Sequence, residues 1–353
     1  MLHRLNFSTS QTRAGSRLLK DHGYLGCPSS QLTTSAPRAG QIGEFNLVLF
    51  RDAGGRPRAL LDRCSHRGVR LSLGRVTEGR IACGYHGWEF DADGELRHVP
   101  SLTAGDKVPV CSVPAFPVVE RDFYVWVWIA GQSPAPTYQP QLIGIGERNW
   151  IEETAIWDVN VIDAVENALD VAHTPFLHPG IYPGHRSEDG IIPPLHQFTV
   201  ECCVVDGGVE LHIPPRPESI SESRSWEQLS VWARFELPYR NYVFLLRRGT
   251  FAILNWTPLA DGSCRLDFMG AFDAERDRTG ATPTAVFQEE ELKILTQDRT
   301  MLESARACVD EGRDFERSVM SDFPQLLARR LYQAALNGND FDFDRRRIFQ
   351  VRG

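Results

Sequence analysis

The chain has 353 residues, of which 42% are hydrophobic and 24% charged, so it is long enough for two folded domains and has an ordinary globular composition. Its net charge of −8 gives no electrostatic basis for non-specific nucleic-acid binding. No run of 18 apolar residues occurs, so we expect no membrane span.

The cysteines and the N-terminus bear on the compartment. The 8 cysteines lack the spacing of a disulfide framework, which predicts free thiols in a reducing compartment, the cytoplasm. Residues 1–23 form an N-terminal extension whose first twenty residues contain three Arg, one Lys and no acid. That composition faintly resembles a transit peptide, but we favour a solvated terminus, and no apolar core argues for export.

Residues 24–135 are predicted to form a small all-β domain. The segment 42–63 has the alternation of a hairpin around Gly54-Gly55. Residues 89–102 predict a second hairpin around Asp93-Gly94, and 116–131, rich in Val and aromatic residues, predict a further strand pair.

Residues 136–353 are predicted to form a second domain that contains helices. The segment 150–178 begins as a strand and becomes helical near Ile162. Strand patterns then follow between 230 and 273, and helical patterns cover 283–312 and 315–337. The acidic run 289–291 is interpreted as the first turn of the longer helix. Together the two domains predict an α+β fold.

Four ligand-type residues lie between positions 64 and 88, namely Cys64, His66, Cys83 and His86. They form the pairs C-x-H and C-x₂-H, and two thiolates with two imidazoles are the ligands of a Rieske [2Fe–2S] cluster. A structural zinc site is the alternative, but zinc pairs usually join like ligands. The aromatic neighbours Tyr85, Trp88 and Phe90 also favour a partly buried redox cluster.

A second constellation, E-N-x₂-D-x₂-H-x₄-H, comprises Glu166, Asn167, Asp170, His173 and His178. On one predicted helix, Asp170 and His173 share a face. Two imidazoles and one carboxylate form the facial triad of non-haem Fe(II) oxygenases, which leaves the opposite side of the ion open for O₂. The carboxylate could come from Asp298, Glu303 or Asp310 in the predicted long helix, or these acids could simply form a solvated face.

The chain from about residue 24 to 340 resembles the Rieske non-haem iron oxygenases, the catalytic subunits of aromatic ring-hydroxylating and demethylating systems. The resemblance rests on the motifs CSHRG, CGYHGWEFDADG, ENALDVAHTPFLHPG and QDRTMLES. It implies a Rieske domain followed by a catalytic domain with an antiparallel sheet flanked by helices, in a helix-grip-like arrangement.

The same resemblance implies roles for the site residues. Cys64, His66, Cys83 and His86 would hold the cluster, and His173, His178 and Asp298 would hold a mononuclear Fe(II). Asp170 would bridge a cluster histidine of one subunit to an iron histidine of its neighbour, which implies a homo-oligomer, most simply a head-to-tail trimer. Asn167 corresponds to a position near the iron.

The expected function is that of a terminal oxygenase with O₂ as co-substrate. Electrons would come from a ferredoxin or a flavin reductase, and from NAD(P)H only indirectly, since the chain has no G-x-G-x-x-G fingerprint. A small apolar, ring-containing substrate is expected. Monooxygenation, as hydroxylation or demethylation, is favoured over cis-dihydroxylation by the compact length and by the motif DVAHTPFLHPG.

Two other classes of function remain as alternatives. A Rieske electron carrier without catalysis would need only residues 24–135, and a zinc-stabilised binding module would need no redox chemistry.

An apolar substrate pocket could use six aromatic residues, which could equally form sheet core: Phe235, Tyr239, Tyr242, Phe244, Phe251 and Trp256. The region 181–225 resembles the family only loosely, so the substrate is left open.

Overall fold

The computed structural model describes residues 18–339, except 20, 122, 131–147, 179–196, 214–230, 246–249, 274–283 and 310–316, together with 341 and 346–352. The chain divides into two compact units. The N-terminal unit comprises Leu18–Thr137 and Thr257–Ala260. The C-terminal unit comprises Tyr138–Trp256 and Asp261–Gly353.

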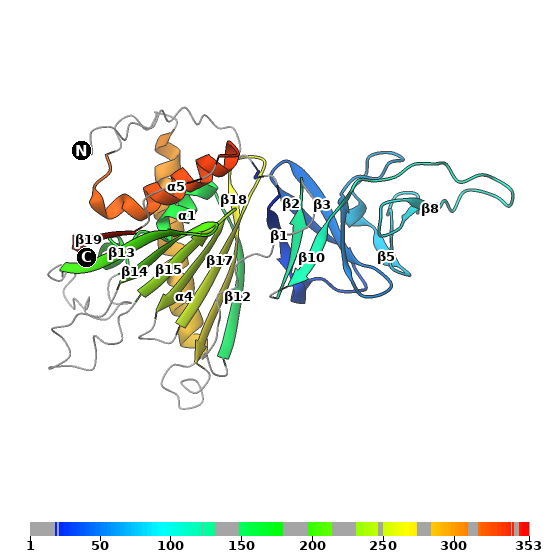
Figure 1. Ribbon diagram of the computed structural model, residues 1–353. Coiled ribbons are helices and arrows are strands. Elements are labelled where there is room, and N and C mark those ends of the chain that lie inside the picture. Colours follow the sequence, from blue (N-terminus) through cyan, green and yellow to red (C-terminus); the bar gives the residue numbers. More distant parts are fainter. Residues whose placement is uncertain are drawn as a thin grey trace. The chain divides into compact units, whose positions relative to one another are not determined.

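Three antiparallel sheets build the N-terminal unit (Figure 1). The first has the order β1 (Gly23–Pro28), β11 (Tyr124–Trp128), β10 (Val118–Arg121). The second has the order β2 (Arg38–Ile42), β3 (Phe45–Arg51), β4 (Pro57–Leu61), β9 (Ala115–Phe116). The third has the order β5 (Arg75–Thr77), β6 (Arg80–Ala82), β7 (Glu89–Phe90), β8 (Leu96–His98). The 3₁₀ helices η1 (Ser29–Gln31) and η2 (Leu71–Leu73) connect strands.

The hairpin predicted at residues 42–63 is confirmed as β3 and β4, and its turn has a clear local cause. Gly55 has φ 76°, a left-handed conformation that glycine adopts without steric cost. The carboxylate of Asp52 accepts hydrogen bonds from the N–H groups of Gly54 and Arg56 at 2.9 and 3.0 Å. The guanidinium of Arg58 donates to the same carboxylate at 2.8 Å, so one acid organises the whole turn.

The core of the N-terminal unit includes the two cysteines of the predicted cluster. Buried apolar side chains, among them Phe50, Ile81 and Phe90, pack in one cluster with Cys64 and Cys83. The loops that carry these cysteines are therefore anchored in the interior of the unit, while the residues between the ligands reach its surface.

An eight-stranded sheet forms the centre of the C-terminal unit. Its order is β12 (Arg148–Trp157), β18 (Cys264–Asp273), β17 (Thr250–Pro258), β16 (Arg240–Leu245), β15 (Val231–Glu236), β14 (Gly208–Ile213), β13 (Gln197–Val205), β19 (Arg346–Arg352). Neighbouring strands pair antiparallel from β17 through to β19. The strands expected between residues 230 and 273 are thus confirmed.

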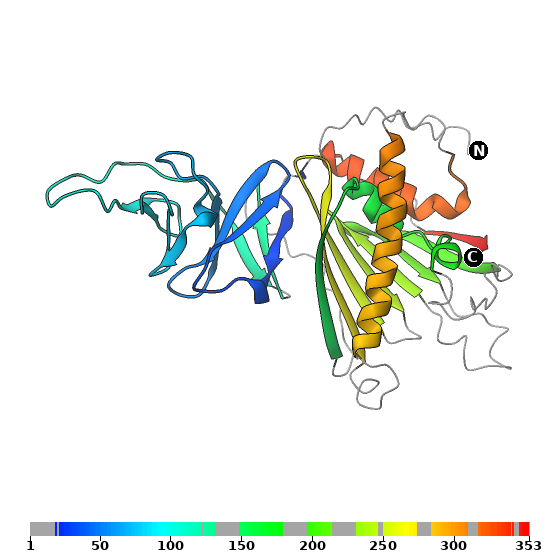
Figure 2. The ribbon, with the colours of Figure 1, turned by 180° about the vertical axis from the view of Figure 1, so that it is seen from behind.

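Helices cover one face of this sheet (Figure 2). They are α1 (Val161–Asn167), α2 (Thr174–Leu177), α4 (Thr284–Val309) and α5 (Phe323–Leu336), with the 3₁₀ helix η4 (Met320–Asp322) before α5. Phe287 of α4 packs against Phe272 of β18 with ring centroids 4.5 Å apart and an angle of 35° between the rings. The amide of Asn241 on β16 donates to the carbonyl of Val165 in α1 at 3.3 Å. We call this the helix-covered face and the opposite side the outer face.

Two helix expectations need correction. The expected single helix from 162 to 178 is interrupted after α1, because the carboxylate of Asp170 accepts the N–H of Ala172 at 2.8 Å and competes with helical hydrogen bonding. Pro175 then lies in the first turn of α2, where its missing N–H costs nothing. The acidic run 289–291 lies in the second turn of α4 rather than the first, since α4 begins at Thr284.

The α+β fold class predicted from the sequence is confirmed, with a small all-β unit and a helix-flanked sheet. Within the described part of the chain, no helix combines the length and the apolar character needed to cross a bilayer. Residues 1–17, the greater part of the expected N-terminal extension, lie outside the described residues.

Candidate functional site

The two loops that carry the predicted cluster ligands share one pattern of backbone hydrogen bonds. The N–H of Cys64 donates to the carbonyl of Val69 at 2.8 Å, and the N–H of Gly68 donates to the carbonyl of Cys64 at 2.9 Å. The loop at Cys83 repeats both bonds, each at 2.9 Å. Gly68 and Gly87 close the loops with φ 73°, where a side chain would be strained.

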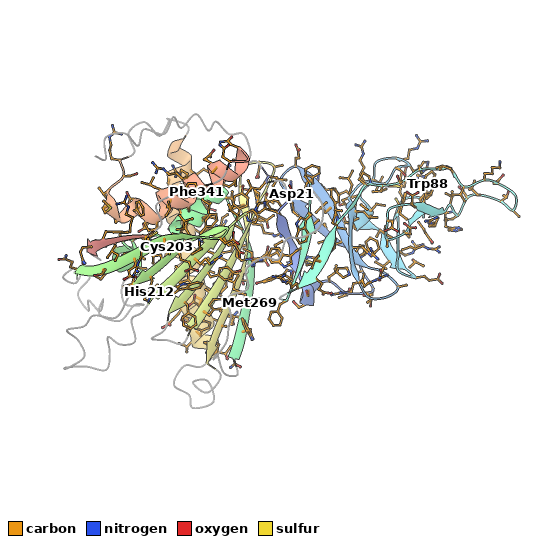
Figure 3. All side chains as sticks on the ribbon, in the orientation of Figure 1. Asp21, Trp88, Cys203, His212, Met269 and Phe341 are labelled. Atoms are coloured by element: carbon orange, nitrogen blue, oxygen red, sulfur yellow. The ribbon has the colours of Figure 1, made fainter. Side chains whose placement is uncertain are left out.

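The structure brings the four predicted cluster ligands together at the end of the N-terminal unit. Cys64 and Cys83 are each 2% exposed, and the rings of His66 and His86 lie with centroids 4.6 Å apart. Trp88, labelled in Figure 3, stacks on His66 at 4.4 Å with an angle of 2° between the rings. The indole therefore covers one face of a predicted ligand.

These residues fit an iron–sulfur cluster. Nδ1 of His66 is buried, and no described residue satisfies it with a hydrogen bond. Burial and the neighbouring His86 lower the pKa of His66, which favours the neutral, ligating imidazole. Burial, with the nearby Cys83 thiol, raises the pKa of Cys64 to about 11, so this thiol ionises readily only when a cation is present. Buried thiols beside an unsatisfied imidazole nitrogen are what a metal cluster requires.

A second group of ligand atoms converges in the C-terminal unit. Nε2 of His173 lies 3.3 Å from Nε2 of His178, and these atoms lie 3.4 and 3.2 Å from Oδ1 of Asp298. His178 follows α2, His173 precedes it, and Asp298 belongs to α4. The ligand atoms of these three residues all lie within 4.8 Å of one another, close enough to hold a single metal ion.

The triangle has the dimensions that a metal ion needs. Three donors on one face of an octahedral ion with bonds of about 2.1 Å lie roughly 3 Å apart. His178 is 1% exposed and Asp298 is 7% exposed, so water does not compensate the crowding of their polar atoms. Oδ1 of Asp298 and Nδ1 of His173 are buried without a hydrogen bond among the described residues. The donor set fits a divalent cation such as Fe(II).

The pKa shifts of the triangle residues also favour a bound cation. Burial opposes protonation of His173, but the carboxylates of Asp170 and Asp298 outweigh it and raise the pKa of His173 to about 9. Burial opposes ionisation of Asp298, yet the two imidazoles hold its pKa below the usual range. In the absence of a cation, a proton on His173 balances the charge of the buried Asp298 carboxylate. A bound cation would replace that proton.

The other candidate residues occupy different positions around the triangle. Oδ2 of Asp170 lies 3.6 Å from Nδ1 of His173, and the Asp170 side chain is 30% exposed. Asn167 ends α1, and its carbonyl accepts the N–H of Asp170 at 3.1 Å. Of the alternative acids, Glu303 instead accepts the N–H of Asp158 at 2.9 Å, and Asp310 lies outside the described residues.

Two contacts, one at the triangle and one between α1 and α5, were not foreseen from the sequence. Oε1 of Gln297 lies 2.9 Å from Nδ1 of His178. Arg329 of α5 makes a bidentate ion pair with Glu166 of α1, at 2.5 and 2.6 Å. Gln297 directly precedes Asp298, so the motif QDR contained a signal for the first contact. Nothing in the sequence pairs Glu166 with a residue 163 positions away.

The six aromatic residues proposed for a pocket divide between the two faces of the sheet. Asn241 contacts α1, and the strand register places Phe235 and Trp256 on the same helix-covered face. The hydroxyl of Tyr239 donates to that of Tyr332 in α5 at 2.6 Å. Tyr242, Phe244 and Phe251 lie on the outer face. These three are therefore separated by the sheet from the helices that carry the triangle.

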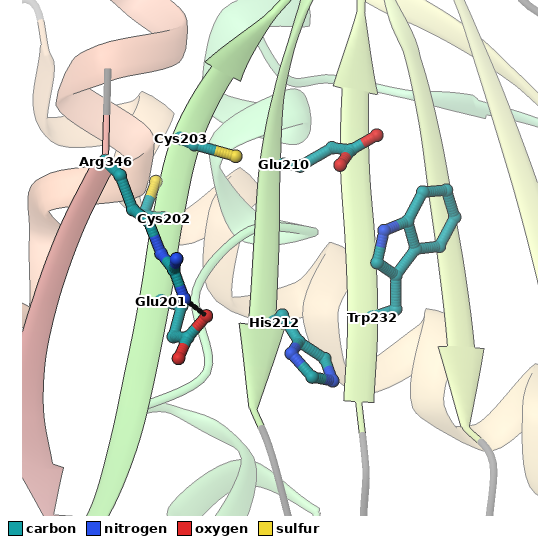
Figure 4. A pocket seen from close by; sticks show the side chains of 7 residues that line it. All are labelled: Glu201, Cys202, Cys203, Glu210, His212, Trp232 and Arg346. Carbon is teal, nitrogen blue, oxygen red and sulfur yellow. Dashed lines mark hydrogen bonds and ion pairs between the residues drawn. The ribbon is translucent and has the colours of Figure 1, made fainter. Parts of the chain in front are cut away.

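A hollow of about 430 Å³ also lies on the outer face (Figure 4). It is lined by Glu201, Cys202, Cys203, Glu210, His212, Trp232 and Arg346. Figure 4 shows the helices behind the strands that bear these side chains. The hollow is therefore separate from the triangle.

Comparisons with known proteins agree with this geometry. Residues 22–117 match the family described as Rieske [2Fe-2S] domain, and residues 157–338 match the family described as Vanillate O-demethylase oxygenase C-terminal domain. A curated relative, chlorophyllide a oxygenase of Chlamydomonas reinhardtii, is 42% identical over 136 residues, covering 37% of this chain and 20% of that protein. The vanillate O-demethylase oxygenase subunit of a Pseudomonas strain is 33% identical over 135 residues, covering 37% of this chain and 40% of that protein.

Among solved structures, dicamba monooxygenase bound to dicamba aligns with a TM-score of 0.68 at 20% identity, covering 91% of this chain and 98% of that chain. This likeness shows a common fold. The matches to the two curated relatives named above span 20% and 40% of those proteins' length. The family match to the oxygenase C-terminal domain extends over more than half of the chain. The chain belongs to the Rieske non-haem iron oxygenases, with a Rieske domain followed by a C-terminal oxygenase domain of the vanillate O-demethylase type.

Proposed function

We propose that this protein is a terminal oxygenase that hydroxylates or demethylates a small apolar, ring-containing substrate with O₂. The observation that carries the proposal is the triangle of His173, His178 and Asp298, whose ligand atoms lie 3.2 to 3.4 Å apart. A carrier that only passes electrons would have no use for this second metal site. A zinc-stabilised binding module would need only the Cys₂His₂ site, for its zinc ion.

In this proposal the N-terminal domain, residues 24–135, holds a [2Fe–2S] cluster, and residues 136–353 hold a mononuclear Fe(II). Cys64, His66, Cys83 and His86 are the cluster ligands, and the triangle provides the iron ligands. When bound, the cluster supplies electrons singly and the iron supplies the activation of O₂.

The chain's own groups orient these ligands. The carboxylate of Asp170 lies 3.6 Å from Nδ1 of His173, so it can fix the imidazole with Nε2 facing the ion. Its 30% exposed side chain is accessible to a cluster histidine of a neighbouring subunit, which supports the bridging role. Asn167 ends the helix that precedes Asp170 and positions it through the backbone.

We favour monooxygenation over cis-dihydroxylation, which is kept as the alternative. Support comes from the names of the similar proteins, a vanillate O-demethylase and a dicamba monooxygenase. The candidates for substrate contact are the residues of the helix-covered face, such as Phe235 and Trp256, because α4 and the sheet enclose that side. Product analysis with a panel of ring compounds identifies the substrate.

The proposed partners are an electron donor and further copies of this chain. Arg63, Arg67, Arg70 and Arg75 are exposed, and none of them has an ion pair with another described residue. The nearby Glu89 is paired with Arg80. This free positive charge beside the cluster loops suits an acidic ferredoxin or a flavin reductase, through which NAD(P)H would act indirectly. The bridging role of Asp170 calls for a homo-oligomer, which we propose is a head-to-tail trimer.

We propose a reducing compartment, the cytoplasm, as the location. The seven described cysteines, including the buried Cys27, Cys202 and Cys264, are all free. Thiols in this state persist where glutathione and thioredoxin keep them reduced.

Iron content tests the proposal directly. Anaerobic reconstitution of the full chain with Fe(II) and sulfide is expected to give the two irons of the cluster and one more. His173→Ala should lose only the additional iron, because the cluster ligands are elsewhere, and Cys83→Ser should lose the cluster. A wild-type chain that binds only two irons would identify the protein as an electron carrier. A chain that binds zinc and shows no EPR signal of a reduced cluster would identify a binding module.

Turnover with ¹⁸O₂, a surrogate reductase and a panel of ring compounds then separates the oxygenase alternatives. Incorporation of one labelled atom is expected, into the ring product for hydroxylation or into the departing one-carbon fragment for demethylation. Incorporation of both into a diol would establish the dioxygenase alternative.

A further inference from the structure

The imidazole of His178 contacts two consecutive residues of α4, one at each ring nitrogen. Nδ1 lies 2.9 Å from Oε1 of Gln297, and Nε2 lies 3.2 Å from Oδ1 of Asp298. His178 is 1% exposed, so water does not replace either contact. One turn of helix thus places a polar atom next to each nitrogen of the ring.

Gln297 accepts a hydrogen bond, and this decides which ring nitrogen carries the proton. A neutral imidazole bears one N–H, and its other nitrogen carries the lone pair that can bind a metal ion. An oxygen of Gln297 opposite Nδ1 requires the proton to be on Nδ1. Nε2, which faces His173 and Asp298, is then left with its lone pair directed at the centre of the triangle.

The second histidine is held in a different way. Nδ1 of His173 faces the carboxylate of Asp170 at 3.6 Å, whereas Nδ1 of His178 faces a neutral amide at 2.9 Å. A carboxylate partner makes an imidazole a stronger electron donor, while an amide fixes orientation without adding charge. The two histidines also differ in exposure, since the side chain of His173 is 20% exposed and that of His178 is 1% exposed.

We propose that Gln297 is a positioning residue that holds His178 in the Nδ1-protonated form, with Nε2 free to bind the ion. This inference rests on the proposed function, namely that His173, His178 and Asp298 bind Fe(II). It assigns to the motif QDR two roles in one metal site, a ligand from Asp298 and the orientation of a second ligand from the residue before it.

The test measures Fe(II) affinity of the metal-depleted full chain under anaerobic conditions, by competition with a chelator. Gln297→Leu keeps the size of the side chain but removes the acceptor, and it is expected to weaken Fe(II) binding about 10- to 100-fold. Gln297→Glu restores an acceptor oxygen and is expected to bind Fe(II) at least as tightly as wild type, because it also adds negative charge. Gln288→Leu makes the same change at an exposed position of α4 and should leave the affinity unchanged.

Absorption of the Co(II)-substituted protein gives a second readout, independent of turnover. Reorientation of the His178 ring in Gln297→Leu should alter the ligand-field bands, while Gln297→Glu and Gln288→Leu should keep the wild-type spectrum. Equal Fe(II) affinity and equal spectra for wild type and Gln297→Leu would overturn the positioning role.

An equal loss of affinity in Gln297→Leu and Gln297→Glu would also overturn it, since the acceptor would then not be the cause. A wild-type chain that binds no mononuclear Fe(II) would instead refute the proposed function, so the two failures are distinguishable.

Discussion

Single side chains decide what the ring nitrogens of the site histidines can do. Gln297 and Asp170 face Nδ1 of His178 and His173, so both Nε2 atoms meet at Asp298. At the other site, Nδ1 of His66 has no hydrogen-bond partner among the described residues. His66 therefore has an unsatisfied Nδ1 at its site, whereas Gln297 occupies Nδ1 of His178 and leaves Nε2 of that ring facing Asp298.

The indole of Trp88 is predicted to tune the cluster. It stacks on His66 at 4.4 Å and keeps water from one face of that ring. Trp88→Ala should raise the reduction potential of the cluster by roughly 40 mV, since about 1 kcal/mol of better solvation would favour the more negative reduced state. A redox titration followed by EPR measures the shift.

Trp88→Phe serves as the conservative control, because a phenyl ring can keep the stacking contact. Its potential should stay close to that of wild type. An alanine variant with an unchanged potential would show that the indole has no electrostatic effect on the cluster.

At the scale of elements, short segments need tertiary partners to form the sites. Helix α1 has 7 residues, too few for stability alone, and Asn160 caps it by accepting the N–H of Ile162 at 3.0 Å. The bidentate pair of Glu166 with Arg329 then fixes α1 to α5. Because α1 leads directly to Asp170 and His173, this ion pair positions one side of the triangle.

Arg329→Met is predicted to destabilise the C-terminal unit. Glu166 and Arg329 are 16% and 19% exposed, so removal of the guanidinium leaves a poorly solvated carboxylate. The free energy of unfolding in urea should fall by about 2 kcal/mol. The double variant Arg329→Met with Glu166→Gln should recover part of this loss, since the charge of Glu166 is then removed as well. Recovery should be incomplete, because Asp163, 3.8 Å from Arg329, keeps its charge.

The exposed pair of Arg299 with Glu303 in α4 provides a matched control. Arg299 is 44% exposed, and Arg299→Met should change the free energy of unfolding by less than about 0.5 kcal/mol. Equal effects at Arg299 and Arg329 would mean that the α1–α5 ion pair has no special structural role.

At the scale of the whole molecule, the chain is expected to work only in an assembly. The proposed bridge through Asp170 connects a cluster in one subunit to an iron in the next. Co-assembly of Cys83→Ser chains, which lack the cluster, with His173→Ala chains, which lack the iron, should therefore restore turnover. Random mixing in equal amounts places the two intact sites at one interface for roughly a quarter of the chains, so about a quarter of wild-type turnover is expected.

Each variant assembled alone serves as the control and should be inactive. Mixtures without turnover would show that each cluster serves the iron of its own chain, and the bridging role of Asp170 would be wrong. Size-exclusion chromatography with light scattering measures whether the mixed assembly is a trimer.

Local sequence was sufficient for much of the fold and for the composition of both candidate sites. The hairpin at residues 42–63 follows from a Gly-Gly turn and alternating strands, and CSHRG and CGYHGW each specify a closed loop through short-range hydrogen bonds. Ligand-type residues within a few positions of one another are recognisable because their contacts are local. For the same reason, the pairing of cysteine with histidine was enough to indicate an iron–sulfur cluster.

Tertiary structure decided what depends on contacts between distant segments. The helix break at Asp170 arises where a side chain competes with the backbone, which helical periodicity does not reveal. Which acid of α4 faces the histidines depends on how that helix lies against residues 161–178, and so does the contact of Gln297 with His178, 119 positions away. The division of the aromatic residues between two sheet faces likewise follows from strand register. The sequence by itself determined which ligands the chain possesses, and the tertiary structure decided which of their atoms meet, because ligand type is local while convergence requires packing.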